Sequence, residues 1–164
     1  VRQQTVSAGS LGEMAAAPNP GRRLASYDAL CRARARFLAR RPGSVLWNEK
    51  AFFYAVESAR LYGGKLLVSG EGETLSWALC GMTGDCCDVV EWMAHPKVRA
   101  ELFGLLLREF PASEYRFRLP ADEAPLVPAL PFQTHPFGMI KPLEGAELPQ
   151  IDSVFPPYLG LSLD

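Results

Sequence analysis

The amino-acid sequence predicts an α/β (α+β) domain built on a mixed, mostly antiparallel sheet with helices on both faces. Two amphipathic helical patterns come first, and three short strand patterns joined by glycine-rich turns follow them. A further helix then leads into a fourth strand, which makes a crossover unit that is right-handed if its two strands run parallel. The 164 residues are enough for one domain with tails.

The two first helices have clear starting signals. Ser26 is expected to cap a helix over residues 27–41, and Asn48 is expected to cap a second one that runs to about residue 62. Glycine and proline pairs follow both segments and end them. One side of the first helix carries Leu30, Arg34, Phe37 and Leu38.

The spacing of the apolar residues then changes to the two-residue period of strands. Residues 65–69, 74–80 and 86–93 are short apolar or alternating runs, and the turns between them are rich in glycine. In the second run, Trp77 faces one side of the sheet and Ala78 the other. This pattern predicts an antiparallel meander.

After the meander, proline at the first helical position starts a helix over residues 96–110. Gly104 in its interior lowers helix stability by about 1 kcal/mol. Residues 114–119 alternate as the fourth strand. Five prolines over residues 120–136 predict irregular, extended chain, and residues 136–143 are a candidate last strand.

Three segments follow from these patterns. Residues 1–23 have no apolar period and are predicted to be a flexible tail or linker, although Val6 and Leu11 could form a short edge strand. Residues 24–143 are predicted to form the domain. Residues 144–164 are predicted to be a C-terminal tail that can dock on it.

Charge and composition exclude several classes of protein. The net charge of −1 and the pI near 6.2 argue against a nucleic-acid-binding protein, and no apolar run is long enough to cross a membrane. Residues 1–60 carry ten Lys or Arg and four Asp or Glu, whereas residues 61–164 carry seven and fourteen. This asymmetry either steers an anionic ligand or reflects ordinary solvated faces.

Cysteine usage favours a reducing compartment. The four cysteines lack CxxC spacing, and no signal peptide opens the chain, so we expect reduced thiols in a cytoplasmic protein. A first residue of valine rather than methionine favours a piece of a longer protein.

The amino-acid sequences of several segments resemble those of a known protein family. These segments are YDALCRARARFLARRPGSVL, GGKLLVSGEGETLSWAL, VVEWMAHPKVRAELFGLLLREFP, RFRLPAD and PFGMIKPL. Over Ser26–Leu143 the chain resembles the degenerate second half of tandem GNAT-family N-acetyltransferases. The resemblance implies a GNAT-like fold and a non-catalytic domain that contributes to the substrate wall and to stability, with the preceding GNAT catalytic domain as its partner. The alternatives are an active acyl-CoA-dependent N-acetyltransferase and a stand-alone module that binds a small ligand or peptide.

If the chain is active, the resemblance implies acetyl-CoA as cofactor. GNAT enzymes hold its pyrophosphate on a glycine-bearing loop and on the N–H groups of the following helix. The matching place here offers His95, Lys97, Val98 and Arg99 as cofactor-binding candidates. It contains no glycine, and Pro96 removes one N–H donor.

Glu91 is the candidate catalytic residue, because several GNAT enzymes place a general base on this strand. The other interpretation is a strand carboxylate in a salt bridge. By strict alternation Val89, Glu91 and Met93 share one face. His95 follows four residues later and could pair with Glu91. The two histidines have no ligand spacing, so no metal site is predicted.

Arg32, Arg36 and Arg40 recur every four residues and share a helix face. This row could hold a phosphate or an acidic partner, contact the preceding domain, or face water. An exposed edge strand at Lys65–Ser69 or Pro136–Leu143 would allow a sheet-mediated homodimer.

Overall fold

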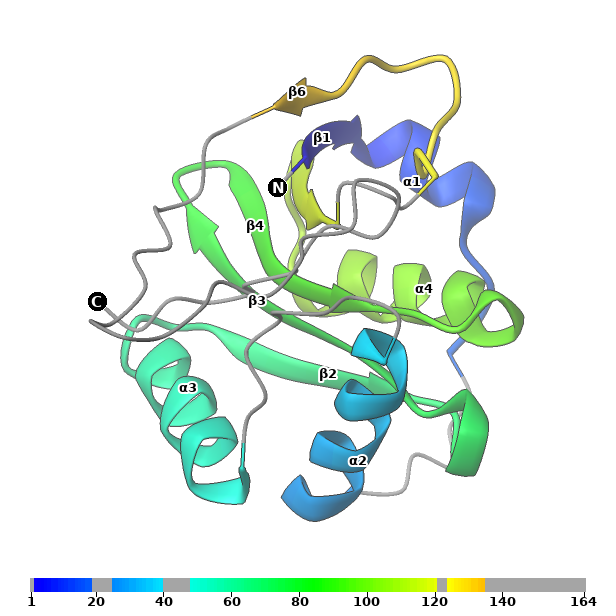
Figure 1. Ribbon diagram of the computed structural model, residues 1–164. Coiled ribbons are helices and arrows are strands. Elements are labelled where there is room, and N and C mark those ends of the chain that lie inside the picture. Colours follow the sequence, from blue (N-terminus) through cyan, green and yellow to red (C-terminus); the bar gives the residue numbers. More distant parts are fainter. Residues whose placement is uncertain (1, 19–24, 40–47, 121–123, 135–164) are drawn as a thin grey trace, which may run out of the picture.

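The computed structural model describes residues 2–18, 25–39, 48–120 and 124–134 (Figure 1). The chain forms β1 (Arg2–Ser7), α1 (Ala8–Met14), α2 (Tyr27–Leu38), α3 (Glu49–Leu61), β2 (Lys65–Ser69), β3 (Ser76–Thr83), β4 (Cys86–Met93), α4 (Arg99–Glu109), β5 (Glu114–Leu119) and β6 (Gln133–Thr134). Two single-turn 3-10 helices, η1 (Gly72–Thr74) and η2 (Pro96–Val98), precede β3 and α4.

Both predicted helix caps are present. The Ser26 hydroxyl accepts a hydrogen bond from the Ala29 N–H at 3.2 Å, and the Asn48 side chain accepts one from the Ala51 N–H at 2.8 Å. Each bond satisfies one of the amide donors that the first turn of a helix leaves without an intrahelical acceptor. After α3 the chain turns at Gly63, whose φ of 75° suits glycine.

The strands form one six-stranded sheet in the order β2-β3-β4-β5-β1-β6. Strands β4 and β5 are parallel, as the crossover through α4 requires, and the other neighbours are antiparallel. Pairing between β4 and β5 stops at Val89 and Phe117, so the carboxyl ends of these two strands are not paired with each other. The mixed, mostly antiparallel sheet predicted from the sequence is confirmed.

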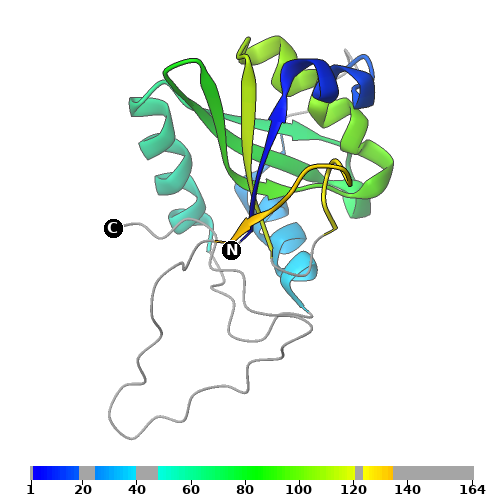
Figure 2. The ribbon, with the colours of Figure 1, turned by 90° about the horizontal axis from the view of Figure 1, so that it is seen from above.

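The sheet separates two hydrophobic clusters, and Figure 2 shows α2 and α3 on one side of it and α1 and α4 on the other. Trp77 packs under α2 and α3, whereas its neighbour Ala78 packs under α4. The alternation predicted for this strand is therefore confirmed. Trp92 stacks on Phe103 of α4, with ring centroids 5.2 Å apart.

The prediction of a flexible tail over residues 1–23 is wrong for residues 2–14, which form β1 and α1. Strand β1 pairs along its whole length with β5, and Val6 and Leu11 are fully buried. A short strand at Val6, the alternative expected from the sequence, is therefore present, but it lies between β5 and β6 rather than at an edge, and Leu11 belongs to α1. Its partner β5 lies more than a hundred residues away, so local periodicity could not reveal this position.

A buried glutamine fastens the proline-rich segment to β1. The Gln4 side-chain amide donates to the carbonyl oxygens of Val127 and Leu130, and its oxygen accepts from the Leu126 N–H at 2.7 Å. Residues 124–132 are irregular, as predicted. The candidate strand Pro136–Leu143 and the predicted tail 144–164 lie outside the described residues.

Candidate functional site

A β-bulge determines where the candidate base points. On β4, Val89 pairs with Cys80 and Glu91 pairs with Leu79, which leaves Val90 without an opposite residue. The extra residue reverses the alternation, so Val89 packs in the α4 cluster and Met93 in the α2–α3 cluster. The prediction that Val89, Glu91 and Met93 share one face is therefore wrong. The carboxylate of Glu91 is turned toward α2.

Glu91 forms a buried ion pair with Arg34. Nε of Arg34 donates to Oε1 of Glu91 at 2.8 Å, and the two side chains are 1% and 0% exposed. Burial raises the pKa of Glu91, while the charge and hydrogen bond of Arg34 and the nearby indole of Trp77 lower it. Neither Glu91 Oε2 nor the Trp77 N–H has hydrogen-bond geometry with any described group. The pair anchors α2 to the sheet and keeps the carboxylate from solvent.

A cavity of about 400 Å³ brings together three residues that sequence analysis named separately. Arg36 of α2, His95 at the start of η2 and Arg99 at the start of α4 all line it. Its apolar lining includes Trp77 and Met93, and a carboxylate is supplied by Glu73. The arrangement offers basic groups around an apolar floor, which suits a small anion with an apolar body.

The amide donors of η2 and its cap are used within the chain. The His95 N–H donates to the Ser76 hydroxyl at 2.9 Å, the Lys97 N–H to Nδ1 of His95 at 3.2 Å, and the Val98 N–H to the His95 carbonyl at 3.1 Å. Pro96 has no N–H to donate. The residues at this turn therefore do not fit the pyrophosphate cradle that the resemblance implied, since they lack both its free amides and its glycine.

The predicted cofactor candidates are dispersed around this turn. Lys97 is exposed, Val98 is buried, and Arg99 is half-buried at the cavity. His95 and Glu91 do not pair, because Glu91 bonds to Arg34 and Nδ1 of His95 accepts from the Lys97 N–H.

The arginine row does not act as one clamp over its described part. Arg32 is exposed and forms an ion pair with Asp28 one turn earlier. Arg36 donates from Nη2 to the Gly72 carbonyl at 3.0 Å and lines the cavity. Arg40 lies outside the described residues. Sequence analysis missed Arg34 as a partner for Glu91, although its place on the apolar side of the helix was the signal.

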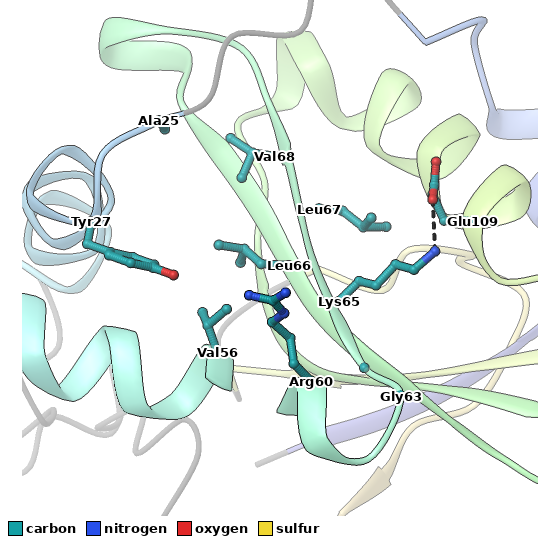
Figure 3. Close-up of a pocket in the computed structure, with 11 residues that line it drawn as sticks. Ala25, Tyr27, Val56, Arg60, Gly63, Lys65, Leu66, Leu67, Val68 and Glu109 are labelled. Carbon is teal, nitrogen blue, oxygen red and sulfur yellow. Dashed lines mark hydrogen bonds and ion pairs between the residues drawn. The ribbon is translucent and has the colours of Figure 1, made fainter. Parts of the chain in front are cut away.

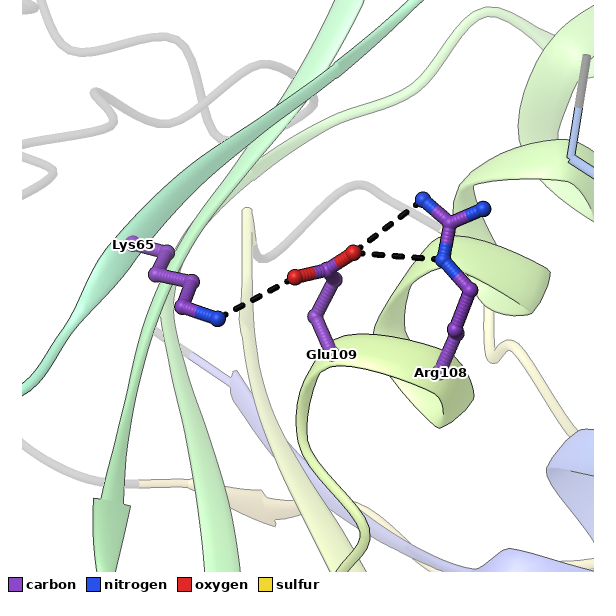
Figure 4. A network of polar contacts seen from close by, with 3 residues as sticks. All are labelled: Lys65, Arg108 and Glu109. Atoms are coloured by element: carbon purple, nitrogen blue, oxygen red, sulfur yellow. Dashed lines mark hydrogen bonds and ion pairs between the residues drawn. The ribbon is translucent and has the colours of Figure 1, made fainter. Parts of the chain in front are cut away.

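A second cavity, of about 540 Å³, follows β2 and was not foreseen from the sequence. Figure 3 shows Tyr27 and Val56 on one side of β2 and Glu109 on the other. Figure 4 shows Glu109 between two cations: Nζ of Lys65 lies 3.1 Å from its Oε2, and Nη2 of Arg108 lies 3.1 Å from its Oε1. These contacts join α4 to β2 across the edge of the cavity.

Lys65 and Arg108 both hold the pKa of Glu109 below its usual value, with the hydrogen bond from Lys65 the larger cause. We expect Lys65→Ala to raise the pKa of Glu109 toward that usual value, because the carboxylate loses this partner. Carboxyl ¹³C shifts followed against pH would measure it. Lys50→Ala, which removes an exposed lysine from α3, is the matched control, and equal Glu109 pKa values in the two variants would contradict the assignment.

The described residues were also considered for a cysteine nucleophile, a metal site and a membrane-spanning helix. All four cysteines have free thiols, and burial raises the pKa of Cys31, Cys80 and Cys86, which disfavours a thiolate nucleophile. Within the described ranges no group of three His, Cys, Asp or Glu side chains could hold a metal ion. Over the same part of the chain, every helix is too short or too polar to cross a membrane.

Comparison with known proteins bears on the fold. No family model and no curated protein matches the sequence, whereas eight chains of solved structures match. One is a conserved protein of unknown function from Enterococcus faecalis V583, described as a probable N-acyltransferase, with 12% identity and a TM-score of 0.59. The match covers 80% of this chain but only 37% of that one, so this chain spans little more than a third of its neighbour. The chain therefore has the GNAT-like, N-acyltransferase fold that its sequence predicted.

Proposed function

We propose that this chain is the non-catalytic GNAT-like half of a two-domain N-acyltransferase. In this role it packs against a catalytic domain, contributes to the wall of the acceptor site and stabilises the whole protein. The observation that carries the proposal is the turn of η2 before α4, where the amides of His95, Lys97 and Val98 are used within the chain and Pro96 has none. A diphosphate would meet side chains there but no free row of backbone donors.

The state of Glu91 supports the same conclusion. A general base must reach the proton that it removes, directly or through one water. Glu91 is fully buried, and its Oε1 accepts from Arg34. Opening this pair to admit an amine would leave a buried guanidinium without its carboxylate, which is strongly unfavourable.

The structural neighbour supports the two-domain part of the proposal. It is described as a probable N-acyltransferase, and more than half of its chain lies outside the matched part. That length leaves room for a further domain of this size. The coding sequence upstream of Val1 tests this directly: an acyltransferase domain with a glycine-bearing loop would support the proposal, and a stop codon directly upstream would overturn it.

We expect acetyl-CoA to give no saturable heat in isothermal titration calorimetry with this chain, even at millimolar ligand, because the pyrophosphate cradle is missing. We also expect no release of free thiol when primary amines and acetyl-CoA are added. A CoA-dependent acyltransferase run in parallel is the positive control for both measurements.

Binding of acetyl-CoA at the turn of η2 would be recognised by its response to two substitutions. Saturable binding that Lys97→Ala weakens, and that Lys50→Ala on α3 leaves unchanged, would overturn the proposal in favour of an active acyl-CoA-dependent enzyme. Lys97 is the exposed cation at the turn that the resemblance marks for cofactor binding, so its loss would separate binding at that turn from binding elsewhere.

A second candidate function is the binding of a small anion without chemistry. The specific observation is the 400 Å³ cavity, where Arg36, His95 and Arg99 surround Trp77 and Met93. Chemical-shift changes in the Trp77 indole N–H on addition of short-chain carboxylates would support it, and their absence would exclude this ligand class.

A further inference from the structure

Helix α3 presents an unusual amount of apolar surface to solvent. Five large hydrophobic side chains are exposed among the described residues. Four of them lie on α3 or directly after it, and the fifth is on β3: Phe53 (43% exposed), Tyr54 (51%), Leu61 (83%), Tyr62 (85%) and Met82 (39%). We call these five residues the α3 surface. Figure 2 shows α3 at the periphery of the molecule, clear of α1 and α4.

The α3 surface has two apolar ends. The rings of Phe53 and Tyr54 have centroids 5.8 Å apart, and Tyr62 and Met82 line the same cavity. Tyr54 and Leu61 are seven residues apart, so they lie on one face of the helix. From Phe53 to Tyr62 the surface extends about 13 Å along the helix axis.

Its area is that of an interface. An aromatic side chain offers about 150–250 Å² to a partner, so the exposed fractions give on the order of 600 Å² for the five residues. The largest apolar patch of a typical monomer is about 300–600 Å² and is often functional. A stable interface takes about 800 Å² from each partner, which the polar rim of the helix would complete.

The α3 surface carries both exposed side chains and a recess. Tyr62 lines a cavity of about 300 Å³ whose lining also includes Ala55, Ala59 and Met82. Leu61, one residue before Tyr62, is 83% exposed. A symmetric dimer pairs the same patch on both copies, so that patch must contain both a protrusion and a recess. The α3 surface contains both, and a partner without this symmetry would need only one of them.

The charges of the helix do not oppose such a contact. Glu57 and Arg60 form an ion pair at 2.9 Å between the two ends of the surface, and Nζ of Lys50 lies 5.8 Å from the centre of the Tyr54 ring. Both signs are therefore present, so two copies meeting face to face need not place like charges opposite each other.

We propose that the α3 surface is the interface of a symmetric homodimer, in which Leu61 of each copy enters the 300 Å³ cavity of the other. The contact lies on the helical layer rather than on the edge of strand β2, where the exposed-strand hypothesis placed it. It goes beyond the proposed acyltransferase role and requires the catalytic domain to pack on another face of this chain. Acetyl-CoA binding and self-association are measured separately, so the two proposals can fail separately.

Sedimentation velocity over a concentration series tests the proposal. We expect the chain to sediment as a dimer at high concentration, and Leu61→Asp to raise the dissociation constant at least tenfold. Ser58→Trp fills the cavity and is expected to have the same effect. Ala17→Asp, which adds the same charge at an exposed position beyond α1, is the matched control and should sediment as the wild type does.

Each variant is first checked for native circular dichroism and for its melting temperature at a concentration where the wild type is monomeric. There we expect no change, because Leu61 and Ser58 are exposed. A monomer at every concentration would overturn the proposal and leave the surface to a different protein. A dimer that neither Leu61→Asp nor Ser58→Trp weakens would also overturn it, since another surface would then hold the copies together.

Discussion

Replacing Arg34 with alanine is expected to lower the free energy of unfolding by about 3–5 kcal/mol, the usual cost of removing one partner of a buried ion pair. The loss has two sources: Glu91 keeps a carboxylate that no solvent can reach, and α2 loses its polar anchor on β4. Urea unfolding followed by tryptophan fluorescence would measure the change, since Trp77 lies beside the pair.

Two control variants distinguish the contribution of burial to this stability loss from the contribution of charge. Arg32→Ala removes an exposed arginine from the same helix and should cost less than about 1 kcal/mol, as surface ion pairs do. The double variant Arg34→Met with Glu91→Leu should recover most of the stability, because an apolar pair of similar volume needs no desolvation. Equal losses for Arg34→Ala and Arg32→Ala would contradict the structure.

Gly104→Ala is expected to lower the free energy of unfolding by about 1–3 kcal/mol, the range for overpacking a core. Helix propensity alone predicts the opposite sign, since alanine is favoured over glycine inside a helix by about 1 kcal/mol. A methyl group at Gly104 would overlap the carbonyl oxygen of Ala16 and reach within 3.3 Å of Pro18 Cδ. The Ala16 N–H also donates to the Ala100 carbonyl at 2.9 Å, which fixes this segment against α4.

Gly12→Ala is the matched control, because Gly12 lies in α1 and an added Cβ there has no neighbour within 4 Å beyond the adjacent residues and backbone of its own helix. It should raise stability by up to about 1 kcal/mol. Thermal unfolding of the two variants would show shifts of opposite sign. A stabilised Gly104→Ala would mean that the chain after α1 does not pack on α4.

The sequence predicts those parts of the fold that depend on neighbours along the chain. Ser26 and Asn48 cap their helices where expected, and Trp77 and Ala78 face opposite sides of the sheet. Each of these features follows from a few adjacent residues. For β1 the sequence offered only a short edge strand as an alternative to a flexible tail. Its place inside the sheet could not be predicted, because its partner β5 lies far away in the sequence and supplies the burial that its pattern lacks.

In the candidate site, too, the sequence predicts what depends on adjacent residues and misses what depends on tertiary contacts. Glu91 was identified from its place on a strand, but its direction depends on the unpaired Val90, which no periodicity reveals. Arg36, His95 and Arg99 come from three separate elements and meet only in the folded chain. The spacing of arginines suggested one row on α2, whereas tertiary contacts bury Arg34 and leave Arg32 exposed.

The position of β1 between β5 and β6 has a consequence for biosynthesis. Strand β1 leaves the ribosome more than a hundred residues before β5, and it can pair in the sheet only after α4 and β5 have been made. Until then Val6 and Leu11 have no apolar residues to pack against, and the nascent chain carries an unpaired strand with which other polypeptides could pair. Slow translation of the residues between α1 and β5 should therefore increase the demand for chaperones that hold the segment of β1 and α1.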